Sequence, residues 1–413
     1  MTISHFQCSM CDNQYDLNQV SYNCPSCGGN LDTHFSFEKN PAKLNRETIL
    51  TSSEQSLWRY APLLAVEDPG YDHTPLHRVG FTPVYQSGRL RANLGLRQLF
   101  IKDDSPNPSA SFKDRASAIV VAKAINDNID TIIAASTGNA GAAMACMAAA
   151  VGKRAIILAP QTAPPAKIAQ LLTYGAEVVL VDGSYDQAFE LTIQASQEFG
   201  WYNRNTGYNP FTVEGKKTAG LEIWEQVLRF LPDSERLNII IPVGDGNILS
   251  GIAKGFIDLL ALGWIESLPR LIGVQAEGSA AIYNAYIQGK NNIEAVQSTT
   301  VADSISVDLP RDGARALKRV RQSGGFYLTV TDDEILAAIP AMGSVGLFVE
   351  PAAATAWAGL VKSLQTGQLD PNEPVLVMST GSGLKDVKAA MKAVEPAPII
   401  EPTIQNLKEI LHV

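Results

Sequence analysis

Short apolar strands and helical segments alternate along most of this chain, and this alternation limits the folds open to it. "TIIAA" (131–135) is typical of a buried strand, "STGN" of a turn, and "AGAAMACMAAAVG" (140–152) of a helix that ends at a glycine. The same order recurs around "RAIILAP", "EVVLVDG", "LNIIIPV", "LIGVQAEG" and "EPVLVMSTGSG". Apolar strand runs that alternate with helices predict an α/β protein with largely parallel sheets.

Length and composition indicate a globular protein with more than one core. A chain of 413 residues is too long for one small core, so we expect two large lobes and a minor module. Apolar residues make up 46% of the chain and charged residues 18%, which is a globular and not a disordered composition. The net charge of −9 offers no general attraction to nucleic acid or to anionic lipid.

The chain opens without a basic and apolar leader, and its longest uncharged run is interrupted. That run, residues 131–152, contains "STGN" and Gly141, so it fits a buried strand, turn and helix better than a membrane span. We expect a cytoplasmic protein with neither a membrane nor a nucleic-acid partner.

Four of the five cysteines form two CxxC pairs near the N-terminus, Cys8 with Cys11 and Cys24 with Cys27. Four thiolates at this spacing suit tetrahedral Zn²⁺. Two disulfides or free thiols are the alternatives, and disulfides fit poorly with a chain that lacks a leader. We predict a zinc ribbon in residues 1–35, with a structural role because four sulfur ligands leave no coordination position open for chemistry.

Four turns rich in Gly, Ser, Thr and Asn lie near the predicted strands, on the side where ligands bind in such sheets. They are "NPSASFKDR" (107–115), "STGN" (136–139), "VGDGN" (243–247) and "STGSG" (379–383). "VGDGN" separates a strand from a helix start, so its backbone amides are suited to hold a phosphate. It is not a dinucleotide fingerprint, because the third position after Gly244 and Gly246 is Leu249.

Histidine is absent between residues 78 and 411, the interval that contains all four turns. A Ser–His–Asp or Cys–His arrangement or a His-ligated catalytic metal is therefore hard to build there. The chain also lacks a G-x-x-x-x-G-K-[ST] loop for nucleotide triphosphates. Lys113, with Phe112 beside it, is then the candidate for chemistry as a lysine that forms a Schiff base with pyridoxal phosphate. The alternative is an exposed lysine at a helix start, paired with an acid such as Asp114.

These turns, in this order, resemble segments of the threonine synthase family, within the fold type II pyridoxal phosphate enzymes. "NPSASFKDR" resembles the cofactor-lysine segment of the family, "STGN" its asparagine loop, "VGDGN" its phosphate loop and "TGSGLKD" its C-terminal segment. "NPFTVEGKKTAGLEI" and "SVGLFVEPAAA" also look like family stretches, and part of the family has an N-terminal zinc ribbon. The resemblance covers roughly residues 78–390.

The resemblance implies two open, mostly parallel α/β domains with the cofactor between them, in addition to the ribbon. The expected large domain spans residues 36–127 and 216–413, and the expected small domain spans residues 128–215. A homodimer that acts on a small amino-acid substrate is implied as well.

The resemblance also assigns roles residue by residue. Lys113 would carry the cofactor covalently, with Phe112 near it. Asn139 would donate a hydrogen bond to the phenolic oxygen of the cofactor, and Thr380 would face its pyridine nitrogen. The other implied contacts are the backbone of Gly244, Asp245, Gly246 and Asn247 with the cofactor phosphate, and Ser136 and Thr137 with the substrate carboxylate. Apart from the resemblance, the candidates for a substrate phosphate pocket are Lys216, Lys217, Arg204 and Lys167.

The implied activity is that of a carbon–oxygen lyase that converts O-phosphohomoserine and water to L-threonine and phosphate. Two positions depart from the family pattern. Ala140 follows the asparagine where a small hydroxyl residue is common, and Thr212 stands where relatives can supply a basic residue for the substrate phosphate. Three alternatives stay open: a serine or threonine dehydratase, β-replacement on phosphoserine as in cysteate synthase, and a zinc-ribbon binding protein without activity.

Overall fold

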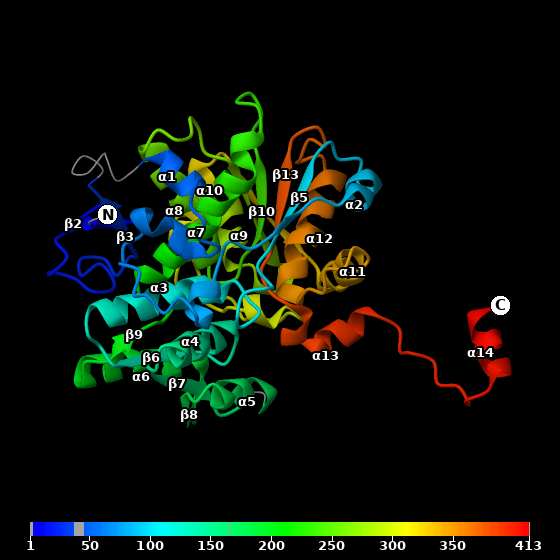
Figure 1. Cartoon of the computed structure of the whole chain (residues 1–413), viewed down its shortest axis with the longest axis horizontal. Helices are drawn as coiled ribbons and strands as arrows, with labels where there is room; N and C mark the ends of the chain where they lie inside the picture. Colours follow the sequence, from blue (N-terminus) through cyan, green and yellow to red (C-terminus); the bar gives the residue numbers. More distant parts are fainter. Residues whose placement is uncertain (1–2, 37–44, 164, 413) are drawn as a thin grey trace.

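Three sheets with helices around them make up the described part of the chain, residues 3–36, 45–163 and 165–412 of a computed structural model (Figure 1). Residues 1–2, 37–44, 164 and 413, which fall within the predicted domains, lie outside this description. The largest sheet has the strand order β12-β11-β10-β13-β5-β4, and its strands run parallel except for the edge strand β4. The strands are β4 (Val84–Tyr85), β5 (Leu99–Asp103), β10 (Asn238–Pro242), β11 (Arg270–Ala276), β12 (Phe326–Val330) and β13 (Val375–Ser379).

The second sheet is smaller and entirely parallel, with the strand order β8-β7-β6-β9. Its strands are β6 (Thr131–Ala135), β7 (Arg154–Pro160), β8 (Glu177–Val181) and β9 (Tyr202–Asn203). The apolar runs of the sequence fall on these strands and on those of the larger sheet. The prediction of an α/β fold with mostly parallel sheets is confirmed.

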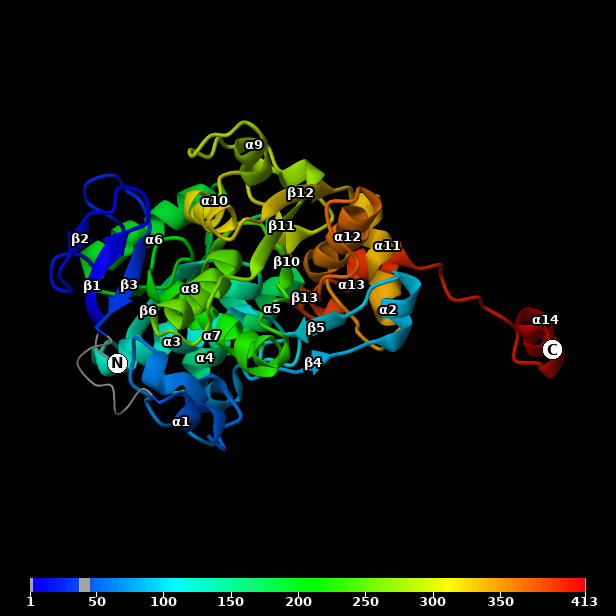
Figure 2. The same cartoon turned by 90° about the horizontal axis from the view of Figure 1, so that it is seen from above.

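Helices connect the parallel strands and cover both sheets (Figures 1 and 2). They are α1 (Arg46–Leu50), α2 (Gly88–Asn93), α3 (Lys113–Asn126), α4 (Asn139–Ala150), α5 (Pro165–Thr173), α6 (Tyr185–Phe199), α7 (Phe211–Gln226), α8 (Asn247–Ala261), α9 (Ala281–Ile287), α10 (Gly313–Gln322), α11 (Asp332–Gly343), α12 (Pro351–Gln365), α13 (Val387–Ala390) and α14 (Ile404–Leu411).

The third sheet is a small antiparallel one at the N-terminus, with the order β2-β1-β3. Its strands are β1 (Ile3–Cys8), β2 (Gln14–Tyr15) and β3 (Leu31–Phe35). The ring of Phe6 packs edge-on against Phe211 at the start of α7, with 6.3 Å between ring centroids. The carboxylate of Asp32 pairs with Arg315 of α10 at 3.0 Å. Apolar and charged contacts therefore both attach the N-terminal sheet to the body.

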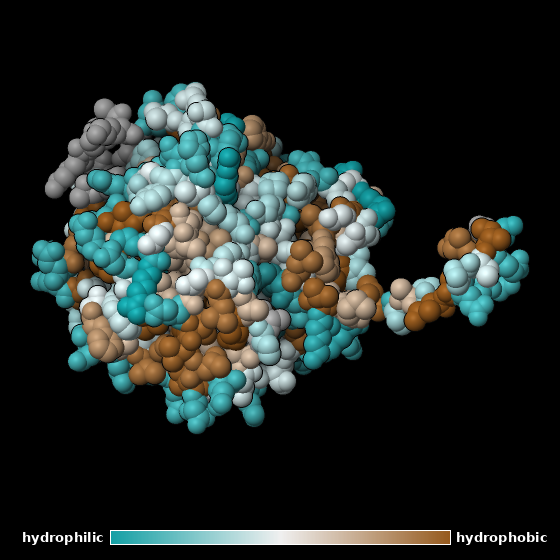
Figure 3. All heavy atoms as spheres, turned by 60° about the horizontal axis from the view of Figure 1, so that its bottom comes forward, coloured by the Kyte–Doolittle hydropathy of each residue, from teal (hydrophilic) through white to brown (hydrophobic). Residues whose placement is uncertain are grey.

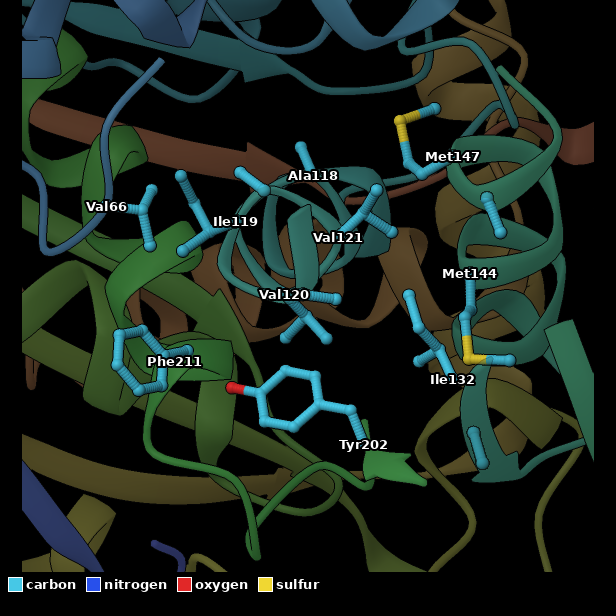
Figure 4. Packing of buried hydrophobic residues seen from close by; sticks show 14 of the residues in the cluster. Val66, Ala118, Ile119, Val120, Val121, Ile132, Met144, Met147, Tyr202 and Phe211 are labelled. Carbon is cyan, nitrogen blue, oxygen red and sulfur yellow. The ribbon is translucent and has the colours of Figure 1, made fainter. Parts of the chain in front are cut away.

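Helix α3, which begins at Lys113, runs through the middle of the molecule. Figure 4 shows Ile119 beside Val66, Val120 over the ring of Tyr202, and Val121 directed toward Met147 of α4. Ten of the fourteen residues of this helix are buried, so it is held from several sides at once. The amine of Lys113 therefore projects from a rigid element between the two parallel sheets.

A buried ion cluster fixes the first turn of α3. The guanidinium of Arg115 donates to Asp104 at 2.6 and 2.9 Å and to Glu222 of α7 at 2.5 and 2.8 Å. Lys102 of β5 donates to the same Glu222 at 2.6 Å. Burial alone would raise the pKa of Glu222, but Arg115 and Lys102 hold it down at about 2. The cluster thus neutralises its own charges and joins β5, α3 and α7.

The C-terminal segment leaves the body of the molecule. Residues 394–403 extend from it, and α14 at their end lies apart from every other element in both views (Figures 1 and 2). None of the residues of α14 is buried. Among the helices of the described residues, none has the length and apolar character needed to cross a membrane.

Candidate active site

A cavity of about 420 Å³ lies between the two parallel sheets, at the carboxyl ends of β6 and β10. Three of the four turns that the sequence singled out contribute to its wall. The lining includes Lys113, residues 136–140, residues 242–249, residues 303–309, Tyr185, Thr206, Lys216 and Arg311. The structure therefore brings together residues more than a hundred positions apart in the sequence.

The turn before Lys113 is held so that its amine faces the cavity. The Ser109 hydroxyl and backbone N–H both donate to the Asp114 carboxylate, at 2.5 and 2.6 Å, and Ala110 between them has φ +64°. The backbone N–H of the fully buried Phe112 donates to the Thr380 carbonyl at 2.8 Å. These bonds join the lysine turn to the end of β13.

The amine of Lys113 has no hydrogen bond or ion pair with any residue in the described part of the chain. Burial lowers its pKa, and the nearby charge of Arg204 lowers it further, whereas Glu350 and Asp245 oppose the shift. An amine with a lowered pKa is neutral more often near pH 7 and is then a nucleophile. Lys113 is therefore not the exposed, acid-paired lysine of the alternative interpretation.

The turn "VGDGN" admits no side chain at its two glycines. A Cβ at Gly244 would lie 2.7 Å from the Cα of Ile305, and one at Gly246, where φ is +95°, would lie 2.8 Å from the Cβ of Ala316. Helix α8 begins at Asn247, which lines the cavity. The first backbone N–H groups of the helix have no partner within the helix and can donate to a group bound in the cavity. This geometry suits an anion such as a phosphate.

Lys216 lies beside this turn. Its amine donates to the Asn247 side-chain oxygen at 2.6 Å, and the Asn247 amide donates to Asp312 at 2.7 Å. Burial lowers the pKa of Lys216 well below its usual value, and the charges of Lys113 and Arg204 act in the same direction. A bound anion would offset this repulsion.

Lys217, the next residue, is turned away from the cavity. Its amine pairs with Glu214 at 2.6 Å and with Asp258 at 3.0 Å, and it lies 4.1 Å from the centroid of the Phe35 ring. The structure thus brings only one of the two adjacent lysines to the site. Lys167 is half-buried and pairs with Asp303 at the cavity rim.

The loop "STGN" lines the cavity together with the turn "VGDGN". The Ser136 hydroxyl oxygen accepts the backbone N–H groups of Gly138 and Gly141, at 3.2 and 3.0 Å. The Asn139 amide donates to both carboxylate oxygens of Glu350 at 3.0 Å and to the Ser304 hydroxyl at 3.3 Å. The side chain of Asn139 therefore lies at the cavity wall, engaged with Glu350 in this structure.

Glu350 and Tyr185 are site residues to which the sequence gave no role. Glu350 is 2% exposed, and burial raises its pKa against the opposing influence of Asn139 and Lys113. An acid between Val349 and Pro351 in the apolar segment "LFVEPAAA" was the signal that could have found it. Tyr185, at the start of α6, lines the cavity from the smaller sheet, and no local sequence signal predicts that.

Thr380 and Thr212 are both buried but lie in different places. Thr380 is at the end of β13, where its carbonyl holds the lysine turn, and its hydroxyl makes no hydrogen bond within the described residues. Thr212 lies in the first turn of α7, and its hydroxyl donates to the Asn209 carbonyl at 2.7 Å. Thr212 does not reach the cavity, whereas Ala140 is part of its lining.

The residues around the cavity fit the cofactor predicted from the sequence. Pyridoxal phosphate requires a free amine for its aldehyde and a backbone cradle for its phosphate. Lys113 supplies an amine without a partner, and the turn at 244–247 supplies a helix start with no room for side chains. Lys216 adds a cation beside that turn.

A second candidate site lies in the N-terminal sheet. The sulfur atoms of Cys8, Cys11, Cys24 and Cys27 all lie within 4.8 Å of one another, and none is in a disulfide. The Tyr15 hydroxyl lies 3.0 Å from the Cys24 sulfur. Four separate thiols in this arrangement match the ligand set of a tetrahedral metal site.

Curated relatives match nearly the whole chain. The threonine synthase of Methanocaldococcus jannaschii is 36% identical over 408 residues, which is 98% of each chain. That of Methanosarcina acetivorans is 35% identical over 411 residues, again 98% of each chain. The threonine synthase of Mycobacterium tuberculosis is 34% identical over 336 residues, 80% of this chain and 90% of the relative.

Solved structures share the fold at lower identity. Threonine deaminase isoform 2 from Solanum lycopersicum has a TM-score of 0.65 at 23% identity, covering 83% of this chain and 89% of the other. Maize serine racemase has a TM-score of 0.65 at 22% identity, covering 78% and 94%. The family model described as "Pyridoxal-phosphate dependent enzyme" matches residues 76–381. With the free lysine and the glycine turn of the cavity, these matches show that the chain belongs to the pyridoxal-phosphate dependent enzymes.

Proposed function

We propose that this enzyme is a threonine synthase, which converts O-phosphohomoserine and water to L-threonine and phosphate. The observation that carries the proposal is the charge around the cavity. Burial lowers the pKa values of Lys113 and Lys216, and the charge of Arg204 lowers both further. None of these three cations forms an ion pair within the described residues. A phosphorylated cofactor and a phosphorylated amino acid together supply the missing negative charge. The curated relatives support this substrate, since those that match over 98% of the chain are threonine synthases.

For cofactor binding we propose one role for each group that the sequence singled out. The backbone of residues 244–247 and the amine of Lys216 would hold the phosphate of the cofactor. Phe112 and Thr380 would bound its ring from the lysine turn and the end of β13, and Asn139 would exchange its bond with Glu350 for one with the phenolic oxygen. Ser136 and Thr137, with the backbone amides of their loop, would take the carboxylate of the substrate.

Lys113 would both anchor the cofactor and move protons. When bound, the cofactor supplies an electron-withdrawing ring that stabilises negative charge on the neighbouring substrate carbons. Lys113, with its lowered pKa, is suited to accept and return protons at Cα and Cβ of the substrate. Phosphate leaves from Cγ, which gains a proton and becomes the methyl group of threonine, and the hydroxyl of water adds at Cβ. The overall change is therefore an elimination followed by a hydration.

Product analysis of the holoenzyme tests the proposal. O-Phosphohomoserine should give threonine and inorganic phosphate in equal amounts, whereas phosphoserine, serine and threonine should react slowly or not at all. Rapid deamination of serine or threonine without use of O-phosphohomoserine would replace the proposal with a dehydratase. Sulfite-dependent loss of phosphate from phosphoserine would replace it with β-replacement.

We also propose that the four cysteines bind one structural Zn²⁺. The ribbon that they close connects to the cavity through buried groups, because Arg315 bridges Asp32 of β3 and Asp312, and Asp312 accepts the amide of Asn247. Metal analysis should find one zinc per chain, and a chelator that does not remove the zinc should leave turnover unchanged. Loss of turnover in Cys24→Ser with an unchanged melting temperature would contradict a structural role.

We propose a homodimer in which the C-terminal arm of each chain, residues 394–412, crosses to its partner. Helix α14 exposes Ile404, Leu407 and Leu411 on one side, and an isolated helix of eight residues is not stable in water. Apolar groups also lie on the body beside the root of the arm, at Leu384, Val387 and Met391, and Figure 3 shows apolar atoms along the arm and at its root. Reciprocal exchange about a two-fold axis would cover both surfaces.

Light scattering tests this dimer with the full chain and with a chain that ends at Val394. The full chain should be dimeric, and the shortened chain should dissociate at concentrations where the full chain does not. Equal dimer stability in both would remove the arm from the interface. A monomeric full chain would indicate that the arm folds back on its own body.

We propose a large domain of residues 36–127 and 216–413, a small domain of residues 128–215, and a cytoplasmic location. The four-stranded sheet lies within residues 128–215, and the strands of the six-stranded sheet lie in the two segments 36–127 and 216–413, which supports those limits. Four unpaired thiols are compatible with a cytoplasmic enzyme.

A further inference from the structure

Arg204 is a buried arginine that lacks a carboxylate partner. It follows β9 and is 1% exposed, and its guanidinium donates to the Thr206 hydroxyl at 2.6 Å and to the Ser117 hydroxyl at 3.3 Å from two nitrogens. Within the described residues no carboxylate oxygen lies within 4.0 Å of it. A buried guanidinium whose contacts are all neutral is costly unless an anion approaches it.

Other buried arginines in the molecule are paired. Arg115 has Asp104 and Glu222, and Arg315 has Asp32 and Asp312. Arg204 differs from them in its position, because its partner Thr206 lines the cavity and its charge acts on Lys113. Burial lowers the pKa of Arg204 to about 10, so it stays a cation at neutral pH. Asp114 and Asp245 oppose this shift from a distance, and an anion in the cavity could approach Arg204 through Thr206.

Thr206 is oriented by this contact. Its oxygen accepts a hydrogen from Arg204, which leaves the hydroxyl proton free to be donated elsewhere. A hydroxyl that lies between a guanidinium and a cavity is a donor well matched to an anionic oxygen.

Two of the anions that enter the cavity already have cradles under the proposed function. The cofactor phosphate has the turn at 244–247 with Lys216, and the substrate carboxylate has the loop at 136–139. The phosphate of the substrate has none, because Thr212, where a basic residue was expected, is turned into α7. The substrate phosphate is therefore the anion without an assigned site, and Arg204 is the buried cation without a carboxylate partner among the described residues.

We propose that Thr206 and Arg204 form the subsite for the phosphate of the substrate. Thr206 donates its proton to a phosphate oxygen, and Arg204 acts through Thr206 as a positioning residue that supplies positive charge. This inference rests on the proposed function, since it assigns the phosphorylated end of the same substrate. It would also explain how the chain binds a substrate phosphate although Thr212 stands where relatives can supply a basic residue.

Thr206→Val and Thr206→Ser make a matched pair, because valine keeps the shape and serine keeps the hydroxyl. In the holoenzyme, Thr206→Val should raise KM for O-phosphohomoserine about tenfold to a hundredfold with a smaller change in kcat, and Thr206→Ser should stay near wild type. Inorganic phosphate should compete with the substrate, and its Ki should rise by a similar factor in Thr206→Val. Arg204→Met should match or exceed the valine variant, and Arg204→Lys should recover part of the loss. Lys153→Ala, which removes a surface ion pair with Asp130 outside the cavity lining, serves as the control and should change neither constant.

Calorimetric titration of the holoenzyme with inorganic phosphate gives a readout that does not depend on turnover. Phosphate should bind wild type more tightly than Thr206→Val or Arg204→Met, while all three retain the cofactor absorbance and the melting temperature shows that they are folded. If O-phosphohomoserine is a substrate but the variants keep the wild-type KM and phosphate affinity, this inference is wrong and the proposed function stands. If wild type ignores O-phosphohomoserine, the proposed function fails, and the phosphate titration still decides whether Thr206 and Arg204 bind an anion.

Discussion

The buried cations that join β5, α3 and α7 differ from the cations around the cavity in whether they have carboxylate partners. Between these three elements, Arg115 and Lys102 lie fully buried with Asp104 and Glu222, and every charge has a partner at hydrogen-bond distance. Around the cavity, Lys113, Lys216 and Arg204 lack carboxylate partners within the described residues. Burial lowers the pKa values of the two lysines, and the charge of Arg204 lowers both further. The first group stabilises the fold, whereas the second is complete only when anions are bound.

The largest effect should follow from Lys113→Ala. Because this amine is proposed both to hold the cofactor and to transfer protons, its loss should reduce kcat by about a thousandfold or more. The fold should persist, since Lys113 makes no ion pair in the described structure. Circular dichroism and steady-state rates would check both statements, and a variant that keeps a tenth of wild-type activity would exclude Lys113 from the chemistry.

The next effect concerns stability. Arg115→Met removes a paired cation, which leaves Asp104 without a cation and Glu222 with Lys102 alone, so the free energy of unfolding should fall by about 3–5 kcal/mol. Arg204→Met is the matched control, because it removes an equally buried but unpaired arginine. Without cofactor it should change stability by less than about 1 kcal/mol. Equal losses in denaturant titrations of the two variants would break the distinction between the two groups.

The adjacent residues Lys216 and Lys217 illustrate which features of the site could be predicted from the sequence and which could not. The strands were predictable because their runs are apolar on both faces, and Lys113 because its turn has a recognisable pattern. Lys216 and Lys217 could not be separated, since neighbouring positions on α7 point about 100° apart and only packing decides which one faces the cavity. That Arg204 lacks a partner, or that Glu350 accepts the amide of Asn139, depends on groups far away in the sequence. No local pattern reports such contacts.

Lys216→Met tests whether the cation beside the turn at 244–247 contributes to cofactor binding. The variant loses a cation beside Asn247, so the Kd of the cofactor should rise about tenfold to a hundredfold. Absorbance titration of the apoprotein with pyridoxal phosphate measures this Kd. Lys217→Met is the neighbouring control, and it should lower stability instead, because it breaks the ion pairs with Glu214 and Asp258. A larger change in cofactor affinity for Lys217→Met would reverse the assignment.

The smallest effect is a dependence of stability on pH. Lys216 has a lower pKa in the folded apoprotein than the usual 10.5, so the unfolded chain binds more protons in the alkaline range below 10.5. The contribution of Lys216 to stability should therefore increase with pH across that range and be complete above 10.5. In Lys216→Met the slope of unfolding free energy against pH should be lower than in wild type. An identical slope would mean that neither burial nor the charges of Lys113 and Arg204 lower the pKa of this amine in the apoprotein.

The account depends most on which amine carries the cofactor, because both Lys113 and Lys216 line the cavity, have lowered pKa values and form no ion pair with any described residue. Borohydride treatment of the holoenzyme fixes the cofactor irreversibly to its lysine, and peptide mapping then identifies the residue. We predict that the label lies on the peptide containing Lys113 and on no other. A label on Lys216, or on any lysine outside the cavity, would contradict the account.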